Sequence, residues 1–248
     1  AGARRRLRYS KQRIKKALKR ADKVRRLARK RRRASQLFNS NVMPSAEYGA
    51  ASHGLAPTDV ASLRAAAARA TGIRAQGKCT TTAIALALGH SRDPLLRLRR
   101  QAVCAWFDFW QRYPSAHWRV DRAWRRSYAR LECKRTRWAR VRGPITALQA
   151  TLRDAGWDPT SPWAWGDVEG NVWSYQSGAL VGMIASALCG SLSRGLWEKA
   201  SRHHLGAGLE KGIDDTVVRR VLGDLDKAND YPAYCMLLSV LTAAVWPR

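Results

Sequence analysis

The residues that come closest to a catalytic metal site are two adjacent carboxylates, Asp214 and Asp215. Paired aspartates can hold Mg²⁺ for phosphoryl transfer, because two cations steady the attacking and leaving oxygens. Here Thr216, Val217 and Val218 follow at once and begin a helical pattern. Carboxylates just before a helix cap its free N–H groups and complement its dipole. We therefore predict that this pair caps a helix and that these residues hold no catalytic site.

Metal ligation by histidine or cysteine is not indicated. His203 and His204 are adjacent, so on a helix they point about 100° apart and cannot chelate one ion. The five cysteines, Cys79, Cys104, Cys133, Cys189 and Cys235, include no Cys-x-x-Cys pair. They are typical of buried apolar residues in a reducing, intracellular compartment, nucleus or cytoplasm. No cofactor is expected.

The charge of the chain is large and unevenly placed. Of a net +28, residues 1 to 33 carry 18 Lys and Arg against the single acid Asp22, and residues 92 to 142 carry 15 against four. Residues 34 to 91 and 143 to 248 are nearly neutral. Blocks of like charge repel themselves and attract polyanions. RNA, DNA or an RNA–DNA hybrid is the expected partner, and an anionic membrane is the alternative.

The candidate phosphate contacts are the cations of these two blocks, arginine above all, because a planar guanidinium engages phosphate bidentately. The predicted nucleic-acid-binding residues are Arg13, Lys16, Lys19, Arg20, Lys23, Arg26, Arg29, Lys30, Arg122, Arg125, Arg126, Arg130, Arg137 and Arg140. Aromatic residues interleave with arginines between residues 115 and 133, as in a base-stacking platform. Their helical spacing favours core packing for the tryptophans.

The elements that must position these residues are helices. Apolar residues recur at spacings of three and four from 4 to 33, 94 to 112 and 115 to 133. Pro44, Pro57, Pro94 and Pro144 indicate helix starts, and Gly54, Gly72, Gly89 and Gly156 indicate ends. Further helices are predicted at 82–88, 180–192, 196–205, 218–225 and 232–246, and a hairpin near 163–175. We predict an all-α fold of antiparallel helices, with a basic region over 1–92 and a connection region over 93–248.

No transmembrane segment is predicted. The longest apolar runs, residues 180 to 192 and 236 to 246, are shorter than the roughly 20 residues that cross a bilayer. No apolar signal-peptide core lies near the opening Ala1-Gly2-Ala3. We expect an excised piece of a longer protein.

One stretch resembles a known family. A Lys/Arg-rich helix is followed by Val42-Met43-Pro44-Ser45-Ala46-Glu47-Tyr48-Gly49, then by Gly54-Leu55 and Leu63-Arg64. This order is similar to the thumb of reverse transcriptases from non-LTR, LINE-like retroelements. The phrases Arg140-Val141-Arg142-Gly143-Pro144-Ile145, Asp154-Ala155-Gly156-Trp157-Asp158-Pro159 and His204-Leu205-Gly206-Ala207-Gly208-Leu209-Glu210 resemble the helical connection region of the same family. The resemblance covers most of the chain.

The resemblance implies a role. It implies a segment that grips the template or hybrid, next to an upstream palm and fingers of the same parent chain, with Mg²⁺ held only in that palm. Two alternatives stay open. One is a stand-alone RNA- or chromatin-binding protein. The other is a peripheral protein lying on anionic lipid through residues 4 to 33, although an apolar face rich in Ala and without Trp or Phe anchors poorly.

Overall fold

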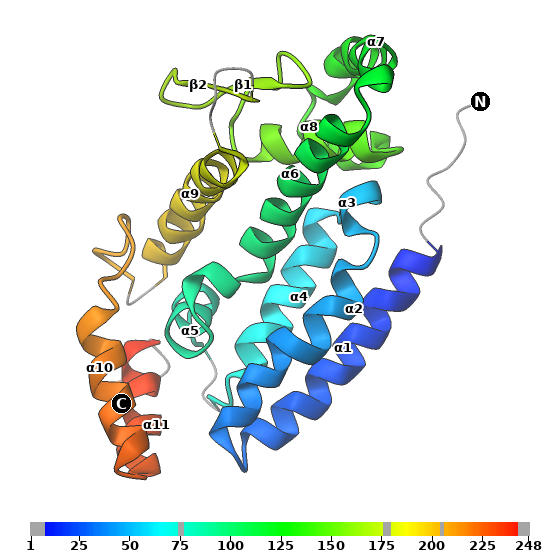
Figure 1. Ribbon diagram of the computed structural model, residues 1–248. Helices are drawn as coiled ribbons and strands as arrows, with labels where there is room; N and C mark the ends of the chain where they lie inside the picture. Colours follow the sequence, from blue (N-terminus) through cyan, green and yellow to red (C-terminus); the bar gives the residue numbers. More distant parts are fainter. Residues whose placement is uncertain (1–7, 74–76, 176–179, 204–205, 243–248) are drawn as a thin grey trace. The chain divides into compact units, whose positions relative to one another are not determined.

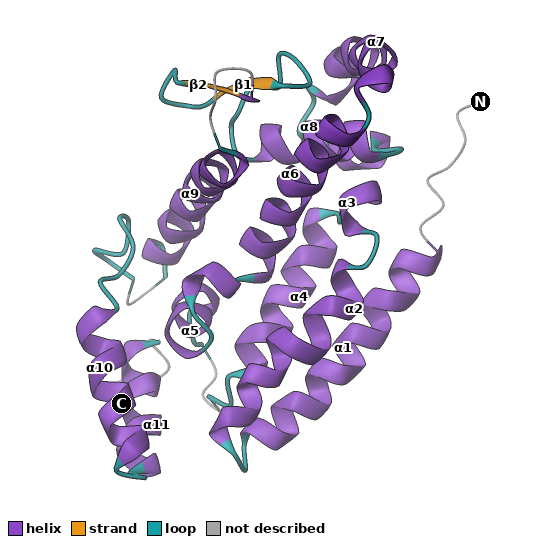
Figure 2. Cartoon of the chain, in the orientation of Figure 1, coloured by secondary structure: helices purple, strands orange, loops and turns teal. Residues whose placement is uncertain are grey.

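The computed structural model of the chain describes residues 8–73, 77–175, 180–203 and 206–242. Most of these residues are helical, and the two strands found among them form one short antiparallel hairpin (Figure 2). The prediction of an all-α fold with a small hairpin is therefore confirmed. None of the described helices is long and apolar enough to cross a membrane.

Figure 1 shows the order of the elements along the chain. The helices are α1 (Arg8–Ala28), α2 (Met43–Glu47), α3 (Ala50–His53), α4 (Pro57–Ala70), α5 (Thr80–Ala87), α6 (Pro94–Arg112), α7 (His117–Tyr128), α8 (Pro144–Asp154), α9 (Val181–Ser201), α10 (Thr216–Lys227) and α11 (Tyr231–Leu241). The strands are β1 (Ala164–Gly166) and β2 (Val172–Ser174). A π-helical turn spans Phe38–Val42, and 3-10 turns lie at Arg32–Gln36, His90–Arg92, Pro114–Ala116, Ala129–Leu131 and Arg137–Arg140.

The chain divides into two compact units, each assembled from segments distant in sequence. Unit 1 comprises residues 1–13, 46–60 and 96–193, and unit 2 comprises residues 14–45, 61–95 and 194–248. Each unit combines residues from both of the predicted regions, 1–92 and 93–248, because the helices pack against partners far away in the chain.

Most predicted helix boundaries are confirmed. Pro57 and Pro94 open α4 and α6, and the Asp93 carboxylate accepts the Leu95 N–H at 2.8 Å. Gly54, which ends α3, has φ +62°, and Gly89, which follows α5, has φ +101°. These left-handed conformations are accessible to glycine at little cost, and they stop a helix.

Three predicted extents are wrong. The basic helix ends at Ala28 rather than 33, where Arg29 to Arg33 place five consecutive like charges on what would have been its last turn. The helix predicted to reach residue 133 ends at Tyr128 and tightens into a 3-10 turn. The two segments predicted at 180–192 and 196–205 form one continuous helix, α9, through Gly195. Only one face of α9 is buried, since Met183 is exposed.

Tryptophans organise the core of unit 1. Trp106 of α6 and Trp124 of α7 are buried with ring centroids 5.4 Å apart. Their indole N–H groups donate to the carbonyl oxygens of Pro162 and Pro159, each at 2.8 Å. Buried Trp side chains need such acceptors. The irregular loop before the hairpin is therefore held on α6 and α7 by hydrogen bonds as well as by packing.

The hairpin pairs Trp165 with Trp173 across its two strands. Its turn is closed by Asp167, whose carboxylate accepts the Trp173 indole N–H at 2.9 Å and the backbone N–H groups of Glu169 and Asn171 at 2.8 and 2.9 Å. These donors, the Trp173 indole first, lower the pKa of Asp167 to about 2.

Two apolar clusters lie among the described residues of unit 2. Cys79 and Ala85 pack with Trp197 and Ala200 of α9, and Leu86 of α5 packs with residues of α10 and α11 that include Leu222, Tyr234 and Leu238. Helices α10 and α11 are consecutive in the sequence and pack against each other (Figure 1). Met236 and Val240 on α11 are exposed, so the last described helix buries only part of its apolar surface.

Candidate nucleic-acid interface

Helix α1 presents a stripe of exposed cations opposite its buried side. The buried residues Ile14, Ala17, Ala21, Val24 and Ala28 repeat at spacings of three and four. Lys16, Lys19, Lys23 and Arg26 repeat in the same way two residues later, and all four are exposed. At 100° per residue this offset places the cations on the side opposite the core. This α1 stripe runs for about 15 Å along the helix.

The other predicted cations of the first block differ in their surroundings. Arg13 is half-buried, donates to the Tyr48 carbonyl oxygen at 3.1 Å and stacks over the Tyr48 ring at 4.2 Å. Arg20 is exposed and donates to the Ser45 hydroxyl. Arg29 and Lys30 are exposed just after the end of α1. Within the stripe, Arg26 forms an ion pair with Asp22 at 2.9 Å.

A second cationic surface lies on α7 in unit 1. Arg119, Arg122, Arg126 and Arg130 repeat at spacings of three and four and are exposed. They line a shallow depression of about 380 Å³ together with Trp118, Ala123 and Ser127. No carboxylate in the described part of the chain pairs with any of the four arginines. We call this set the α7 surface.

The buried side of α7 explains why these arginines are displayed. Val120, Trp124 and Ser127 are buried, and the Ser127 hydroxyl donates to the buried Gln149 amide oxygen at 2.7 Å. The core therefore fixes the rotation of α7 and leaves the arginine stripe in solvent. Trp118 is 61% exposed, with the Arg119 guanidinium over its ring at 5.2 Å. The helical spacing between residues 115 and 133 favoured core packing for the tryptophans of that segment, and this prediction is confirmed for Trp124 but wrong for Trp118.

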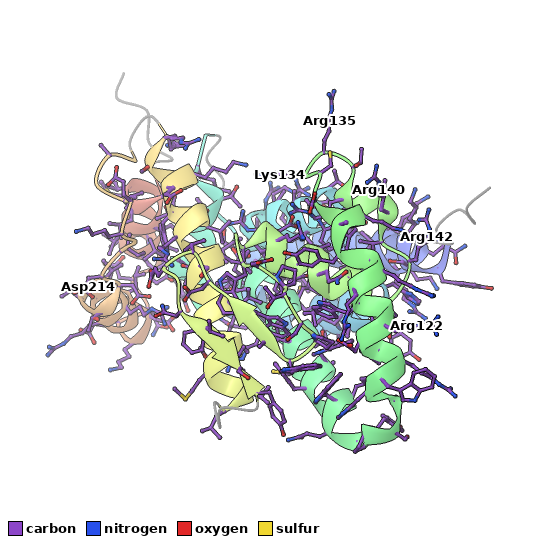
Figure 3. The ribbon with its side chains drawn as sticks, turned by 90° about the horizontal axis from the view of Figure 1, so that it is seen from above. Arg122, Lys134, Arg135, Arg140, Arg142 and Asp214 are labelled. Atoms are coloured by element: carbon purple, nitrogen blue, oxygen red, sulfur yellow. The ribbon has the colours of Figure 1, made fainter. Side chains whose placement is uncertain are left out.

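The chain after α7 adds further cations to unit 1. Figure 3 shows Arg122 on α7, then Lys134 and Arg135 in the following loop and Arg140 and Arg142 after it, with Arg135 pointing away from the ribbon. All five are exposed. The Arg140 guanidinium donates to the Arg130 carbonyl oxygen at 2.8 Å, which ties the loop to the end of α7. Arg125, also predicted as a phosphate contact, is exposed but forms an ion pair with Asp121.

Arg137 was predicted to contact phosphate, and the structure corrects this. Its side chain is buried, and its guanidinium donates to the Leu131 and Glu132 carbonyl oxygens at 2.9 and 3.2 Å and to Asp154 at 2.9 Å. The 3-10 turn at Arg137–Arg140 directs this side chain inward. Arg137 joins the loop to α8 and has no exposed donor group to offer a ligand.

The Asp214–Asp215 pair lies at the start of α10. Asp214, which is labelled in Figure 3, accepts the Thr216 N–H at 3.0 Å, and this bond lowers the pKa of Asp214. Asp215 forms an ion pair with Arg219 one turn later. The N-cap residue is Asp215, whose side chain accepts no helix N–H, so the predicted role is met only by the preceding Asp214, which accepts the first N–H of α10. Across the described ranges, no three His, Cys, Asp or Glu side chains are grouped closely enough to hold a metal ion.

Histidine and cysteine add little to the site. The His203 ring hydrogen-bonds the Gly77 carbonyl oxygen at 2.6 Å, and His204 lies outside the described residues. All five cysteines are free. Cys79 is buried, but Cys133 and Cys235 are exposed, which corrects the prediction that the cysteines are core residues.

Comparison with known proteins found no match to any family model, curated protein or solved structure. The geometry alone therefore describes the interface. Like charges one turn apart on a helix cost about 0.2–0.5 kcal/mol each. The six such neighbouring pairs in the α1 stripe and the α7 surface together cost about 1–3 kcal/mol. Placing that many cations in two stripes weakens the free chain and favours a bound polyanion.

Proposed function

We propose that this chain is a non-catalytic nucleic-acid-binding segment that binds phosphates through two surfaces, the α1 stripe of unit 2 and the α7 surface of unit 1. One observation carries the proposal. Each stripe lies on a helix whose other side is fixed by a buried core, so the cations are held in rows that face solvent. Phosphate contacts of this kind bind with little regard to sequence, because they do not reach base edges.

The α7 surface adds a feature that a purely electrostatic patch lacks. Trp118 is exposed beside four arginines, and an exposed indole in a cationic groove can stack on an unpaired base. Such stacking contributes about 1–3 kcal/mol per base and does not select among bases. We therefore place single-stranded nucleotides, rather than continuous duplex, at this part of the interface.

The fuller proposal retains the family resemblance. In it, the chain is the thumb and connection region of a non-LTR reverse transcriptase, gripping a template or hybrid for a palm supplied by the parent chain in an intracellular compartment. Its support is the order of Val42-x-Pro44 and Tyr48-Gly49 behind a basic helix. The parent reading frame then encodes an aromatic-x-Asp-Asp turn ahead of Ala1. A complete gene without one would leave the stand-alone RNA- or chromatin-binding protein in its place.

The membrane alternative loses its main physical basis. An amphipathic helix binds a bilayer by inserting its apolar face. The apolar side of α1 from Ile14 to Ala28 is buried in unit 2 and is not available for insertion. Binding to lipid would then rest on charge alone.

The test is the salt dependence of binding, measured by fluorescence anisotropy with a labelled single strand and a labelled hybrid. For duplex DNA, log K falls by about 0.9 per phosphate contact for each unit of log salt, and for single strands by about 0.7. We expect the triple variant Arg122→Gln, Arg126→Gln, Arg130→Gln to reduce the slope by about 2 on a single strand. Replacing Lys16, Lys19 and Lys23 by Gln should have a similar effect.

A matched control removes the same charge elsewhere. Arg112, Lys199 and Lys227 are exposed and lie on neither stripe. Their triple replacement by Gln should change the slope by less than about 1, since it removes no proposed phosphate contact. Equal losses of slope in the control and the stripe variants would show that only net charge matters, and would overturn the assignment of the interface.

A further inference from the structure

A pocket of about 460 Å³ in unit 2 gathers cations from three separate segments. Arg25 comes from the last turn of α1 and Arg29 directly follows that helix, Arg69 comes from the last turn of α4, and Lys78 precedes α5. We call these four residues the cation pocket. Only Arg29 belongs to the nucleic-acid-binding set predicted from the sequence.

A glycine brings the two helix ends together. Gly72 follows α4 with φ +83°, and a Cβ built on it would lie 3.0 Å from the Ala28 carbonyl oxygen at the end of α1. Any larger residue would therefore push the end of α4 away from the end of α1. The approach places Arg69 beside the arginines of the α1 end, where all three line one pocket.

The C-terminal ends of α1 and α4 stabilise some of the positive charge of the cation pocket but not all of it. The carbonyl groups at the ends of α1 and α4 attract cations, an effect of about 0.3–1 kcal/mol for each charge. The pKa of Lys78 is nevertheless lowered to about 8, first by burial and then by repulsion from Arg69, Arg25 and Arg29. The Lys78 ammonium donates to the Ile73 carbonyl oxygen at 2.6 Å. Lys78 is therefore partly buried beside three guanidinium groups that repel its charge.

Counter-charge is scarce among the described residues of the pocket. No carboxylate lines it. Asp22 forms an ion pair with Arg25 at 3.1 Å, but it also pairs with Arg26 on the other side. The Arg25 Nε is buried without any hydrogen-bond partner. A buried donor that lacks an acceptor costs about 1–3 kcal/mol.

We propose that the cation pocket binds a phosphate group, held by Lys78, Arg69 and Arg29 at the start of α5. Guanidinium and ammonium groups are the donors that bind phosphate in proteins, arginine in a bidentate manner and lysine as a point charge. Thr80, the first residue of α5, also lines the pocket. This site is separate from the α1 stripe and the α7 surface, and it does not depend on the proposed function.

The size of the pocket bears on what carries the phosphate. A water molecule takes about 30 Å³ in the liquid, so 460 Å³ is more space than one tetrahedral anion needs. A phosphate ester with part of its organic group can therefore enter. A strand phosphate and free inorganic phosphate share the chemistry that the cations recognise, and the experiment separates these two sources.

The experiment follows the side-chain NMR signal of Lys78 in the full 248-residue chain, assigned with the Lys78→Arg variant. Sulfate is the first probe, because it is a tetrahedral dianion that does not titrate near pH 8. A bound dianion stabilises the ammonium, so the pKa of Lys78 should rise from about 8 toward its ordinary value near 10. Inorganic phosphate and dinucleotides with a 5′-phosphate or a 5′-hydroxyl are then compared by competition against sulfate.

The variants decide the outcome. Arg69→Gln should weaken sulfate binding about tenfold, since it removes a charge-assisted hydrogen bond. Lys199→Gln removes an equal charge from the exposed side of α9 and should change the affinity for sulfate by less than about twofold. Arg69 is exposed, so its replacement should keep the helical circular dichroism. A Lys78 signal that ignores sulfate up to about 0.15 M, or equal weakening by both variants, overturns the site.

Discussion

The buried ion pair between Arg64 and Asp93 should be the most sensitive point of unit 2. Asp93 is 1% exposed, and both of its oxygens accept from the Arg64 Nε, at 3.0 and 2.9 Å. Arg64 also donates to the buried Thr81 hydroxyl at 3.0 Å, and Asp93 caps α6 through the Leu95 N–H. The pair thus joins α4, α5 and the start of α6.

Removing one partner leaves a charge without its counterion in a site where Asp93 is buried and Arg64 is mostly buried. We expect Asp93→Asn to cost about 3–5 kcal/mol of the free energy of unfolding, because Asn keeps the cap and the shape but not the charge. Arg64→Met should cost a similar amount. For a chain of this size, such a loss lowers Tm by about 6–20 °C. Thermal unfolding followed by circular dichroism at a helical wavelength measures it.

The double variant Asp93→Asn, Arg64→Met tests whether the two side chains are coupled. With both charges gone, neither side chain leaves the other unpaired, so the loss should be smaller than the sum of the single losses by at least about 2 kcal/mol. Single losses below about 1 kcal/mol, or a double variant equal to their sum, would show that the pair does not hold these helices together.

Two further predictions concern glycine and pH. Gly54→Ala should destabilise by about 1–3 kcal/mol in urea unfolding, because φ is +62° and the new Cβ would lie 2.8 Å from the Trp138 ring, whereas Gly190→Ala inside α9, with nothing within 4 Å, should stabilise by about 0.5–1 kcal/mol. Equal effects at the two sites would contradict the steric argument. The pKa of Asp167 is depressed to about 2 in the folded chain, so its contribution is present above its unfolded pKa near 4 and is lost as pH falls toward 2. Hairpin fluorescence from Trp173 should titrate in that window, and Asp167→Asn should abolish the step.

Local signals in the sequence were sufficient for the helix boundaries set by proline and glycine. Pro57, Pro94, Gly54 and Gly89 act within one turn of the chain, so their effect does not depend on distant residues. The hairpin was predictable for the same reason, since its turn lies at Val168 to Gly170, where Gly170 has φ +85°. The end of α1 at Ala28 was not, because arginine and lysine favour helix individually and only their crowding opposes it.

The candidate sites were predictable only where they follow one helix. The α1 stripe and the α7 surface repeat at helical spacing, so the sequence alone predicts most of their members. Trp118 and Trp124 lie on the same helix, and only the orientation of α7 about its axis makes Trp118 exposed and Trp124 buried. In the sequence, Arg137 does not differ from the neighbouring arginines, and only the tertiary structure shows that its guanidinium donates to Asp154 of α8. Arg69 and Lys78 join Arg25 only through tertiary contact at Gly72.

The uncompensated arginines of α7 have a practical consequence for anyone who handles this protein. A chain that carries +28 gains folding free energy from any polyanion that binds only its native form, by mass action. Preparations without a polyanion should therefore melt at lower temperature in dilute buffer than in moderate salt, and under the proposed function traces of copurifying oligonucleotide should raise the apparent Tm. The ratio of absorbance at 260 and 280 nm becomes part of any report of its thermal stability.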